Sequence, residues 1–174
     1  MQKDFSYILK IEDLTQNQQH YHLSANKNER QTLKEILKVE DVKSFEADII
    51  LKMSHKTHRL DIKGEARAIL GLKSVVSLEN FDKEYVAPFE YYFDTEMTYQ
   101  DLKNMDLDIN DEAPEIVENG QIDLAQIAIE QIALVMEDYP RREGEVFSFI
   151  SEFDEETTKT PHPFAVLEKL KNKK

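Results

Sequence analysis

Four of the five histidines form two closely spaced pairs, which is the spacing that a metal site would use. His20 and His22 are two residues apart, and His55 and His58 are three apart. Residues two apart in a strand point to one face, so His20 and His22 could both reach one ion. Zinc needs at least a third protein ligand, and neither pair has an obvious one nearby. The chain has no cysteine, which excludes a thiolate site. We therefore predict surface histidines, with no metal and no cofactor.

Carboxylates could serve acid–base catalysis, which needs them in convergent pairs. The chain has 35 Asp and Glu, so close pairs arise by chance. Asp123 and Glu130 share a helix face in the pattern, but Asp at the beginning of a helix is favoured for capping alone. There is no G-x-S-x-G elbow and no glycine-rich phosphate loop, and the chain has only four glycines. We predict that the protein is not an enzyme.

Basic residues are concentrated between positions 52 and 73. This stretch has six Lys or Arg and two acids, a local charge of +4 in a chain of −13. Cations can hold RNA phosphates without reading bases. Lysines on the solvent face of a hairpin are equally expected as protection against aggregation, so both interpretations stay open. The candidate RNA-binding residues, expected on one outward surface, are Lys52, Lys56, Arg59, Lys63 and Arg67.

The acidic balance of the whole chain argues against strong non-specific RNA binding. It leaves a local basic face, or a basic protein partner to which an acidic surface is steered. Residues 94–118 have nine acids and one lysine and are predicted to form a solvated acidic loop. Residues 151–174 form a polar and then basic tail, with four lysines at its end, whose simplest interpretation is a solvated terminus.

The elements that must position these residues are mostly strands. Alternating apolar and polar residues, with short connections, favour antiparallel pairing. Gly64 suggests a bulge or bend. The aromatic row Phe89, Tyr91 and Phe93 could stack on bases, but a core-facing row is the preferred interpretation. The predicted strands are residues 5–14, 18–25, 45–53, 60–70, 73–78 and 85–93.

Residues 122–136 are apolar nearly all round, with only Asp123 and Glu130 charged, which predicts a buried helix. Asp123 is the expected N-cap, with Gln126 completing a capping box, and Pro140 ends the pattern. Shorter helices are expected at residues 28–39, capped by Asn26 or Asn28, and at 163–174. We predict an α+β fold in which an antiparallel sheet, flat or curled toward a barrel, packs with one long buried helix and shorter helices.

Length and composition predict one domain over residues 1–174. The 40% hydrophobic content is typical of globular proteins. There is no apolar run of the kind found in signal peptides or membrane spans. The absence of cysteine suits a reducing compartment. We expect a soluble cytoplasmic protein without membrane contact.

Four stretches, in order, resemble the YceD-like family, in a proteobacterial branch that lacks a cysteine pair. Gly64 and Val75–Val76–Ser77–Leu78–Glu79 resemble its G-x-A-x-A…C-V-V-T-L-E stretch. The helix at 122–136 resembles its I-D-L…E-Q-L-A-L, residues 139–142 its Y-P-R, and residues 163–171 its closing P-F-A-V-L…L-K. The residues carried over as structural family motifs are Gly64, Leu78, Glu79, Asp123, Leu124, Glu130, Gln131, Pro140, Pro163 and Phe164.

The resemblance implies a process rather than a chemistry. It implies a non-enzymatic factor in ribosome biogenesis that supports accumulation of 23S-type ribosomal RNA. Its partner would be ribosomal RNA or a large-subunit precursor, reached directly or through a basic ribosomal or assembly protein. Ser74 and Ser77 stand where relatives carry cysteines, so a metal role of those relatives does not carry over. The alternative is an acidic protein-interaction module that binds a basic partner without RNA contact.

Overall fold

The computed structural model describes residues 5–105, 113–117 and 119–146. The chain divides into two compact units, Met1–Glu143 and Gly144–Lys174, and all the helices and strands named below belong to the first. The expected single domain stays a prediction. The predicted tail at 151–174, with the helix at 163–174 and the motif residues Pro163 and Phe164, lies outside the described residues.

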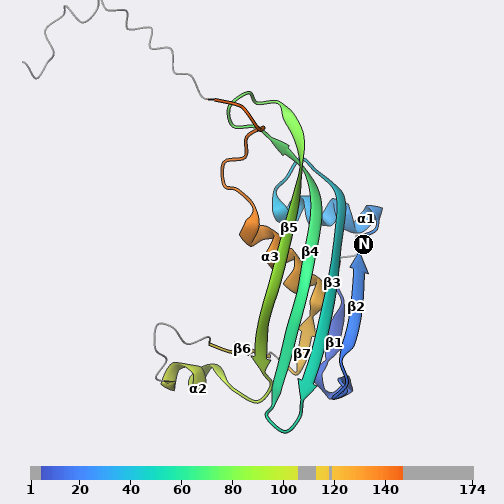
Figure 1. Cartoon of the computed structure of the whole chain (residues 1–174), viewed down its shortest axis with the longest axis vertical. Coiled ribbons are helices and arrows are strands. Elements are labelled where there is room, and N and C mark those ends of the chain that lie inside the picture. The colour runs from blue at the N-terminus through green and yellow to red at the C-terminus, as the bar shows by residue number, and fades with distance from the viewer. Residues whose placement is uncertain (1–4, 106–112, 118, 147–174) are drawn as a thin grey trace, which may run out of the picture. The chain divides into compact units, whose positions relative to one another are not determined.

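A five-stranded sheet forms the main layer (Figure 1). Its strand order is β2-β3-β4-β5-β6, antiparallel except for the parallel pair β5–β6. A small second sheet pairs two short strands, β1 and β7, antiparallel. The bounds are β1 Ile8–Lys10, β2 Gln19–Ser24, β3 Asp41–Ser54, β4 Arg59–Lys73, β5 Asn80–Asp94, β6 Glu115–Ile116 and β7 Gln121–Asp123.

The predicted α+β class and the mostly antiparallel pairing are confirmed. The described strands form two sheets and no closed barrel, so the expected curling is not confirmed. The predicted first strand, 5–14, is shorter than expected, because β1 is followed by a 3-10 turn, Ile11–Asp13. The strand predicted at 73–78 is wrong, because β4 runs on to Lys73 and a turn follows.

One face of the five-stranded sheet, the inner face, is covered by helices (Figure 1). Helix α1, Lys27–Leu37, contacts β3, and α3, Leu124–Val135, contacts β3, β4 and β5. Every second residue of the long strands points inward, so Phe45, Ala47 and Ile49 are each 1% exposed. The aromatic row of β5 lies on this face, with Phe89 7% exposed and Tyr91 and Phe93 packed against the core. Its core-facing assignment is therefore confirmed.

Helix α3 is buried on one side only. Leu124, Ala128 and Ile132 are 0% exposed, whereas Leu134 is 76% exposed. The helix has 12 residues, so the expectation of one long buried helix is not confirmed. The sheet covers one side of α3 and leaves the other side of the helix exposed to solvent.

Asp123 caps α3, as predicted. Its carboxylate accepts hydrogen bonds from the backbone N–H groups of Ala125 and Gln126, at 3.0 and 3.4 Å. It also accepts one from the Tyr7 N–H at 2.8 Å and one from the Ser6 hydroxyl at 2.6 Å. The predicted capping box is wrong, because the Gln126 side chain donates to Glu130, at 2.9 Å. Asp123 thus joins the N-terminal segment to the beginning of α3.

Helix α1 begins with a true capping box. The Asn26 side chain accepts from the Glu29 N–H, and the Glu29 carboxylate accepts from the Asn26 N–H. This confirms Asn26, rather than Asn28, as the cap. The predicted acidic loop, 94–118, contains a further short helix, α2, Tyr99–Asn104, and β6. Residues 106–112 and 118 of that loop lie outside the described part of the chain.

Gly64 does not form the predicted bulge. The pairing is continuous through Ile49, Gly64 and Phe89, and the register shift of β3 lies between Val42 and Ser44 instead. A Cβ at position 64 would lie 2.6 Å from the Asp48 carbonyl oxygen and 2.7 Å from the Phe89 ring. Glycine is needed here because the ring occupies the space that a side chain would fill.

The turn between β4 and β5 is joined to the segment after α3. The Ser74 side chain, in a residue that is 0% exposed, accepts from the N–H groups of Val76 and Ser77, at 3.1 and 3.3 Å. The Val75 N–H donates to the Pro140 carbonyl at 2.9 Å. Arg142 pairs with Glu79 at 3.1 Å. Two stretches that resemble family motifs in the sequence therefore meet in space.

Candidate functional site

The opposite face of the five-stranded sheet, the outer face, is exposed to solvent. Arg59, Lys63 and Arg67 of β4 are all exposed, since they alternate with the buried residues of the same strand. Lys52 is the exposed outward residue near the end of β3, and Lys56 lies in the turn that joins β3 to β4. Four of the five predicted RNA-binding cations therefore share the outer face, with Lys56 beside them.

A basic hollow lies at the hairpin end of this face, where β2 to β5 run side by side. Three of the five cations, Lys52, Arg59 and Lys63, line it together with the acids Asp61 and Glu90. These side chains carry three positive and two negative charges, which leaves +1. The hollow has a volume of ≈ 670 Å³, which is within the usual size of small-ligand sites. Its other lining residues are Gln18, Ile50, Ile62, Tyr91 and Tyr92.

The cations of the basic hollow have weak partners. Arg59 donates to Asp61 at 2.6 Å, and Lys63 pairs with Glu90 at 3.0 Å. All four side chains are between 46% and 71% exposed, and ion pairs so exposed are worth roughly 0–1 kcal/mol. Lys52 has no ion-pair partner within the described ranges. Arg59 and Lys63 can therefore exchange a carboxylate for a phosphate at little cost.

Tyr92 is the aromatic lining residue of the basic hollow that turns outward, whereas Tyr91 turns inward. Tyr92 lies opposite Asp61 in the β4–β5 pairing, and the guanidinium carbon of Arg59 lies 3.9 Å from its ring centroid. This distance is that of a cation–π contact. Sequence reasoning missed Tyr92, although the alternation that turns Tyr91 inward requires Tyr92 to turn outward.

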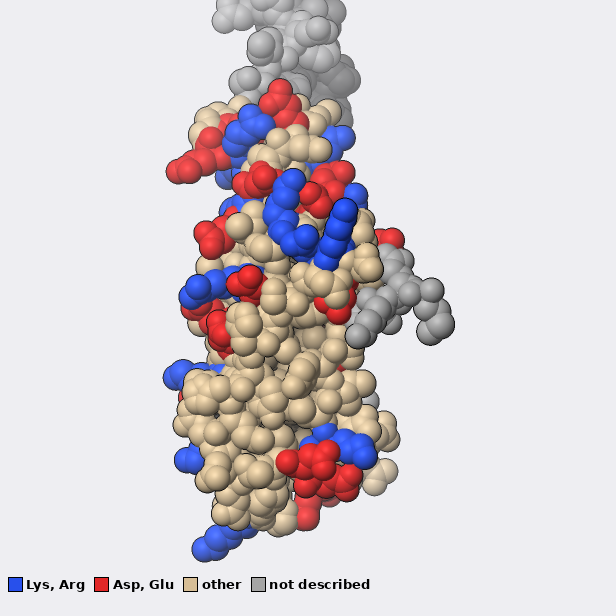
Figure 2. All heavy atoms as spheres, turned by 90° about the vertical axis from the view of Figure 1, so that its right-hand side faces the viewer, with Lys and Arg blue, Asp and Glu red and all other residues tan. Residues whose placement is uncertain are grey.

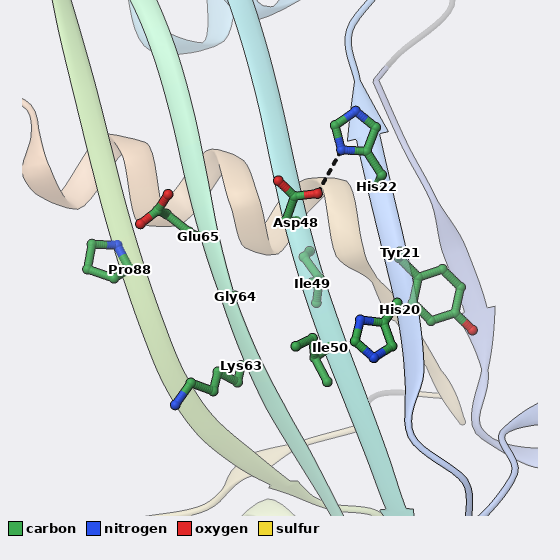
Figure 3. A pocket seen from close by; sticks show the side chains of 10 residues that line it. All are labelled: His20, Tyr21, His22, Asp48, Ile49, Ile50, Lys63, Gly64, Glu65 and Pro88. Atoms are coloured by element: carbon green, nitrogen blue, oxygen red, sulfur yellow. Dashed lines mark hydrogen bonds and ion pairs between the residues drawn. The ribbon is translucent and has the colours of Figure 1, made fainter.

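A second hollow, the histidine hollow, adjoins the first and shares Ile50 and Lys63 with it. Figure 3 shows His22 and Asp48 facing each other across β2 and β3, and their side chains are 2.8 Å apart. Glu65 lies opposite Asp48 on β4. The Asp48 carboxylate accepts a hydrogen bond from the His22 ring, and this bond, together with the negative charge of Asp48, raises the pKa of His22 above its usual value.

The histidine hollow belongs to an acidic part of the outer face. Arg67 pairs with Glu65 and also feels the charges of Asp48 and Glu84, and these carboxylates raise the pKa of its guanidinium. Glu46 adds a further negative charge near His22. The outer face is therefore divided, with the +1 hollow at the hairpin end and an acid-rich part around Arg67. Sequence counting over residues 52–73 missed this, because most of these acids lie on β3 and β5.

Among the described histidines, His20, His22 and His58 each bond a neighbouring polar side chain. His20 bonds the Gln18 side chain at 3.0 Å, and His58 pairs with Glu96 at 3.0 Å. His58 also joins the turn between β3 and β4 to the end of β5, because its backbone carbonyl accepts a hydrogen bond from the Thr95 N–H at 2.8 Å. Within residues 5–105, 113–117 and 119–146, no three His, Asp or Glu side chains are grouped so that they could hold an ion.

Charge is also uneven on the side of the molecule that carries the β2 edge. Figure 2 shows acidic and basic side chains interleaved toward the end that carries α1, few charged side chains over the middle of this side, and a smaller group of both signs toward the opposite end. No continuous basic field is visible on this side. Among the described helices, none is long and apolar enough to cross a membrane.

The comparisons with known proteins give one match. The model of the family described as "Large ribosomal RNA subunit accumulation protein YceD" matches residues 62–171, which is well over half of the chain. The matched range covers most of β4, all of β5 and the whole of α3. No curated protein and no solved structure matches.

Proposed function

Because this chain belongs to the YceD family of large ribosomal RNA subunit accumulation proteins, we propose that it is a non-catalytic factor in ribosome biogenesis that supports accumulation of 23S-type ribosomal RNA. The observation that carries the proposal is the family match over residues 62–171. The proposed place of action is the cytoplasm, where it would meet large-subunit precursors.

The proposed mode of action is direct contact between RNA and the basic hollow. What supports it is that Lys52, Arg59 and Lys63 converge on one hollow instead of spreading along the strands. Phosphate contacts need such cations and no base readout. Lys56 at the tip and Arg67 farther along β4 are proposed as outer contacts, with Arg67 the weaker because carboxylates surround it.

The charge of the whole chain limits this contact. The net charge of −13 makes the chain repel RNA at long range. The basic hollow opposes that repulsion with only three cations, Lys52, Arg59 and Lys63. We therefore expect weak binding that falls with salt and that gains from a second contact within the precursor particle. The proposed contact positions the chain on the RNA and does not provide tight, non-specific RNA binding.

The proposal is tested by removing two charges from the hollow. Lys52→Gln together with Lys63→Gln should abolish co-sedimentation of the chain with large-subunit precursors. Lys27→Gln together with Lys103→Gln is the matched control, since both lysines are exposed and lie on α1 and α2. Unchanged co-sedimentation of the hollow variant would remove the basic hollow from the proposal.

A second candidate is a module that binds a basic protein and never touches RNA. The acid-rich part of the outer face, with Asp48, Glu65 and Glu84 near Arg67, favours it, as does the acidic segment 94–118. Binding of the purified chain to purified RNA across a salt series separates the two. A loss of affinity with salt is expected for phosphate contact, whereas no RNA binding with retained capture of a basic ribosomal protein supports the second candidate.

A further inference from the structure

We infer that the basic hollow receives single-stranded RNA, with one unpaired base stacked at the Arg59–Tyr92 pair and the neighbouring phosphates on Lys52 and Lys63. This inference rests on the proposed function and names the form of RNA that the site takes.

The contact between Arg59 and Tyr92 provides the place for a base. The Arg59 guanidinium carbon lies 3.9 Å from the Tyr92 ring centroid, and the Arg59 side chain is 50% exposed. Unpaired bases stack on aromatic rings and on guanidinium planes alike. A base that enters the hollow can therefore extend the Arg59–Tyr92 stack. In a duplex the bases are already stacked on each other, so this contact is open only to a single strand.

The lysines lie where the phosphates of the same strand would need them. Lys52 on β3 and Lys63 on β4 line the same hollow as Tyr92 on β5. Lys52 lies opposite Asp61, and Asp61 lies opposite Tyr92, in the strand pairing. Tyr92 therefore lies in line with Lys52 across the paired strands. Lys63 belongs to the neighbouring line of outward residues, which it shares with Glu90. One nucleotide can then place its base on the aromatic contact and its phosphate on a lysine of the same hollow.

Carboxylates limit the length of strand that the hollow can hold. The adjoining histidine hollow has Asp48 and Glu65 in its wall, and Asp94 lies opposite Arg59 on the other side. A phosphate chain that continued in either direction would meet carboxylates. A rigid duplex with two phosphate rows would meet them at once, whereas a flexible single strand can turn away after few nucleotides.

The test uses fluorescein-labelled poly(U) as the single strand, with poly(A)·poly(U) as the duplex and free uridine monophosphate as the lone nucleotide. We expect poly(U) to bind more tightly than the duplex. Two phosphate contacts give a slope of log affinity against log salt of about −1.4. Lys52→Gln with Lys63→Gln should remove most of this slope. Binding of the free nucleotide as tight as that of poly(U) would contradict a strand contact.

Tyr92 gives the sharper variant. Tyr92→Ala should weaken poly(U) binding roughly tenfold to a hundredfold, because stacking of one base is lost. Tyr92→Phe keeps the ring and should stay within about twofold of the wild type, since stacking does not need the hydroxyl. Thermal melting of each variant shows that the fold is kept, and a Tyr92→Leu variant replaces Tyr92→Ala if that one unfolds.

The outcomes separate this inference from the proposed function. If the lysine variant loses RNA while Tyr92→Ala keeps it, or if the duplex binds as well as poly(U), the stacking inference is overturned and the RNA contact stands. If no RNA binds the wild-type chain, the inference fails together with the direct-contact mode of the proposed function.

Discussion

The inner and outer faces of the same sheet carry different kinds of information. The inner face and the helix on it hold family-motif residues such as Gly64, Leu124 and the cap Asp123, each fixed by packing or by hydrogen bonds. The outer face holds the lining residues of the basic hollow, among them Lys52, Arg59, Lys63 and Tyr92. Strand register, rather than packing in the core, brings these side chains together. The family signature therefore describes the scaffold, while the proposed working surface lies behind it on the same strands.

The largest difference between the faces should appear in stability. Leu124→Ala opens a cavity beneath the sheet, because Leu124 is 0% exposed, and should lower the free energy of unfolding by about 2–5 kcal/mol. Ile69→Ala on the outer face, where the side chain is 38% exposed, should cost much less. Urea denaturation measures both. Equal losses would mean that the outer face is covered in solution.

A smaller effect is expected at the helix cap. Asp123→Ala removes an acceptor for Ala125, Gln126, Tyr7 and Ser6 and should cost about 1–2 kcal/mol. Asp123→Asn keeps a capping oxygen and should retain most of the stability. Protection of the Tyr7 amide from hydrogen exchange should fall in the alanine variant. If it does not fall, the N-terminal segment is held by other contacts.

The scaffold is largely predictable from the sequence because its signals are local. The alternation along β3 and β4, the cap at Asp123 and the inward row of β5 each depend on neighbours within a few residues. Tertiary contacts decide the rest. A glycine within a strand pattern indicates a bulge, but the partner of Gly64 is the Phe89 ring on another strand. At the cap, Gln126 bonds Glu130 one turn along its own helix, while Tyr7 and Ser6 occupy the carboxylate of Asp123.

The site is only half predictable for the same reason. The run at 52–73 contains the five cations and their partners Asp61 and Glu65. It does not identify the other acid neighbours, because Glu90 and Glu84 belong to β5 and Asp48 to β3. The register of three strands decides which charges meet. Tyr92 can be found from the alternation that turns Tyr91 inward, whereas its contact with Arg59 depends on how β4 and β5 pair.

The cations of the outer face should matter little for stability. Lys52→Gln with Lys63→Gln removes one exposed ion pair, between Lys63 and Glu90, and exposed pairs contribute roughly 0–1 kcal/mol. The thermal midpoint should stay close to that of the wild type and of the Lys27→Gln, Lys103→Gln control. A large loss of stability would show that these lysines support the fold, and it would weaken every binding test that uses them.

The smallest expected effect is the titration of His22. Asp48 raises the pKa of His22 above its usual value, so Asp48→Asn should lower that pKa. A raised pKa in the folded state means that the pair stabilises the fold fully below the unfolded pKa and that this gain is lost as pH rises through the folded pKa. NMR titration of the histidine rings measures the shift, and His20 is the internal comparison. If the pKa of His22 is the same in the Asp48→Asn variant as in the wild type, the 2.8 Å contact between His22 and Asp48 is not kept in solution.

The level of 23S-type ribosomal RNA, in cells whose only copy of this gene is a variant, tests most directly whether the outer face does the work. If it does, Lys52→Gln with Lys63→Gln should lower that level as far as deletion of the gene does, while the folded protein is present at wild-type amount. Lys27→Gln with Lys103→Gln should leave the level unchanged. A wild-type RNA level with the hollow variant would contradict the proposal that the basic hollow is the working surface.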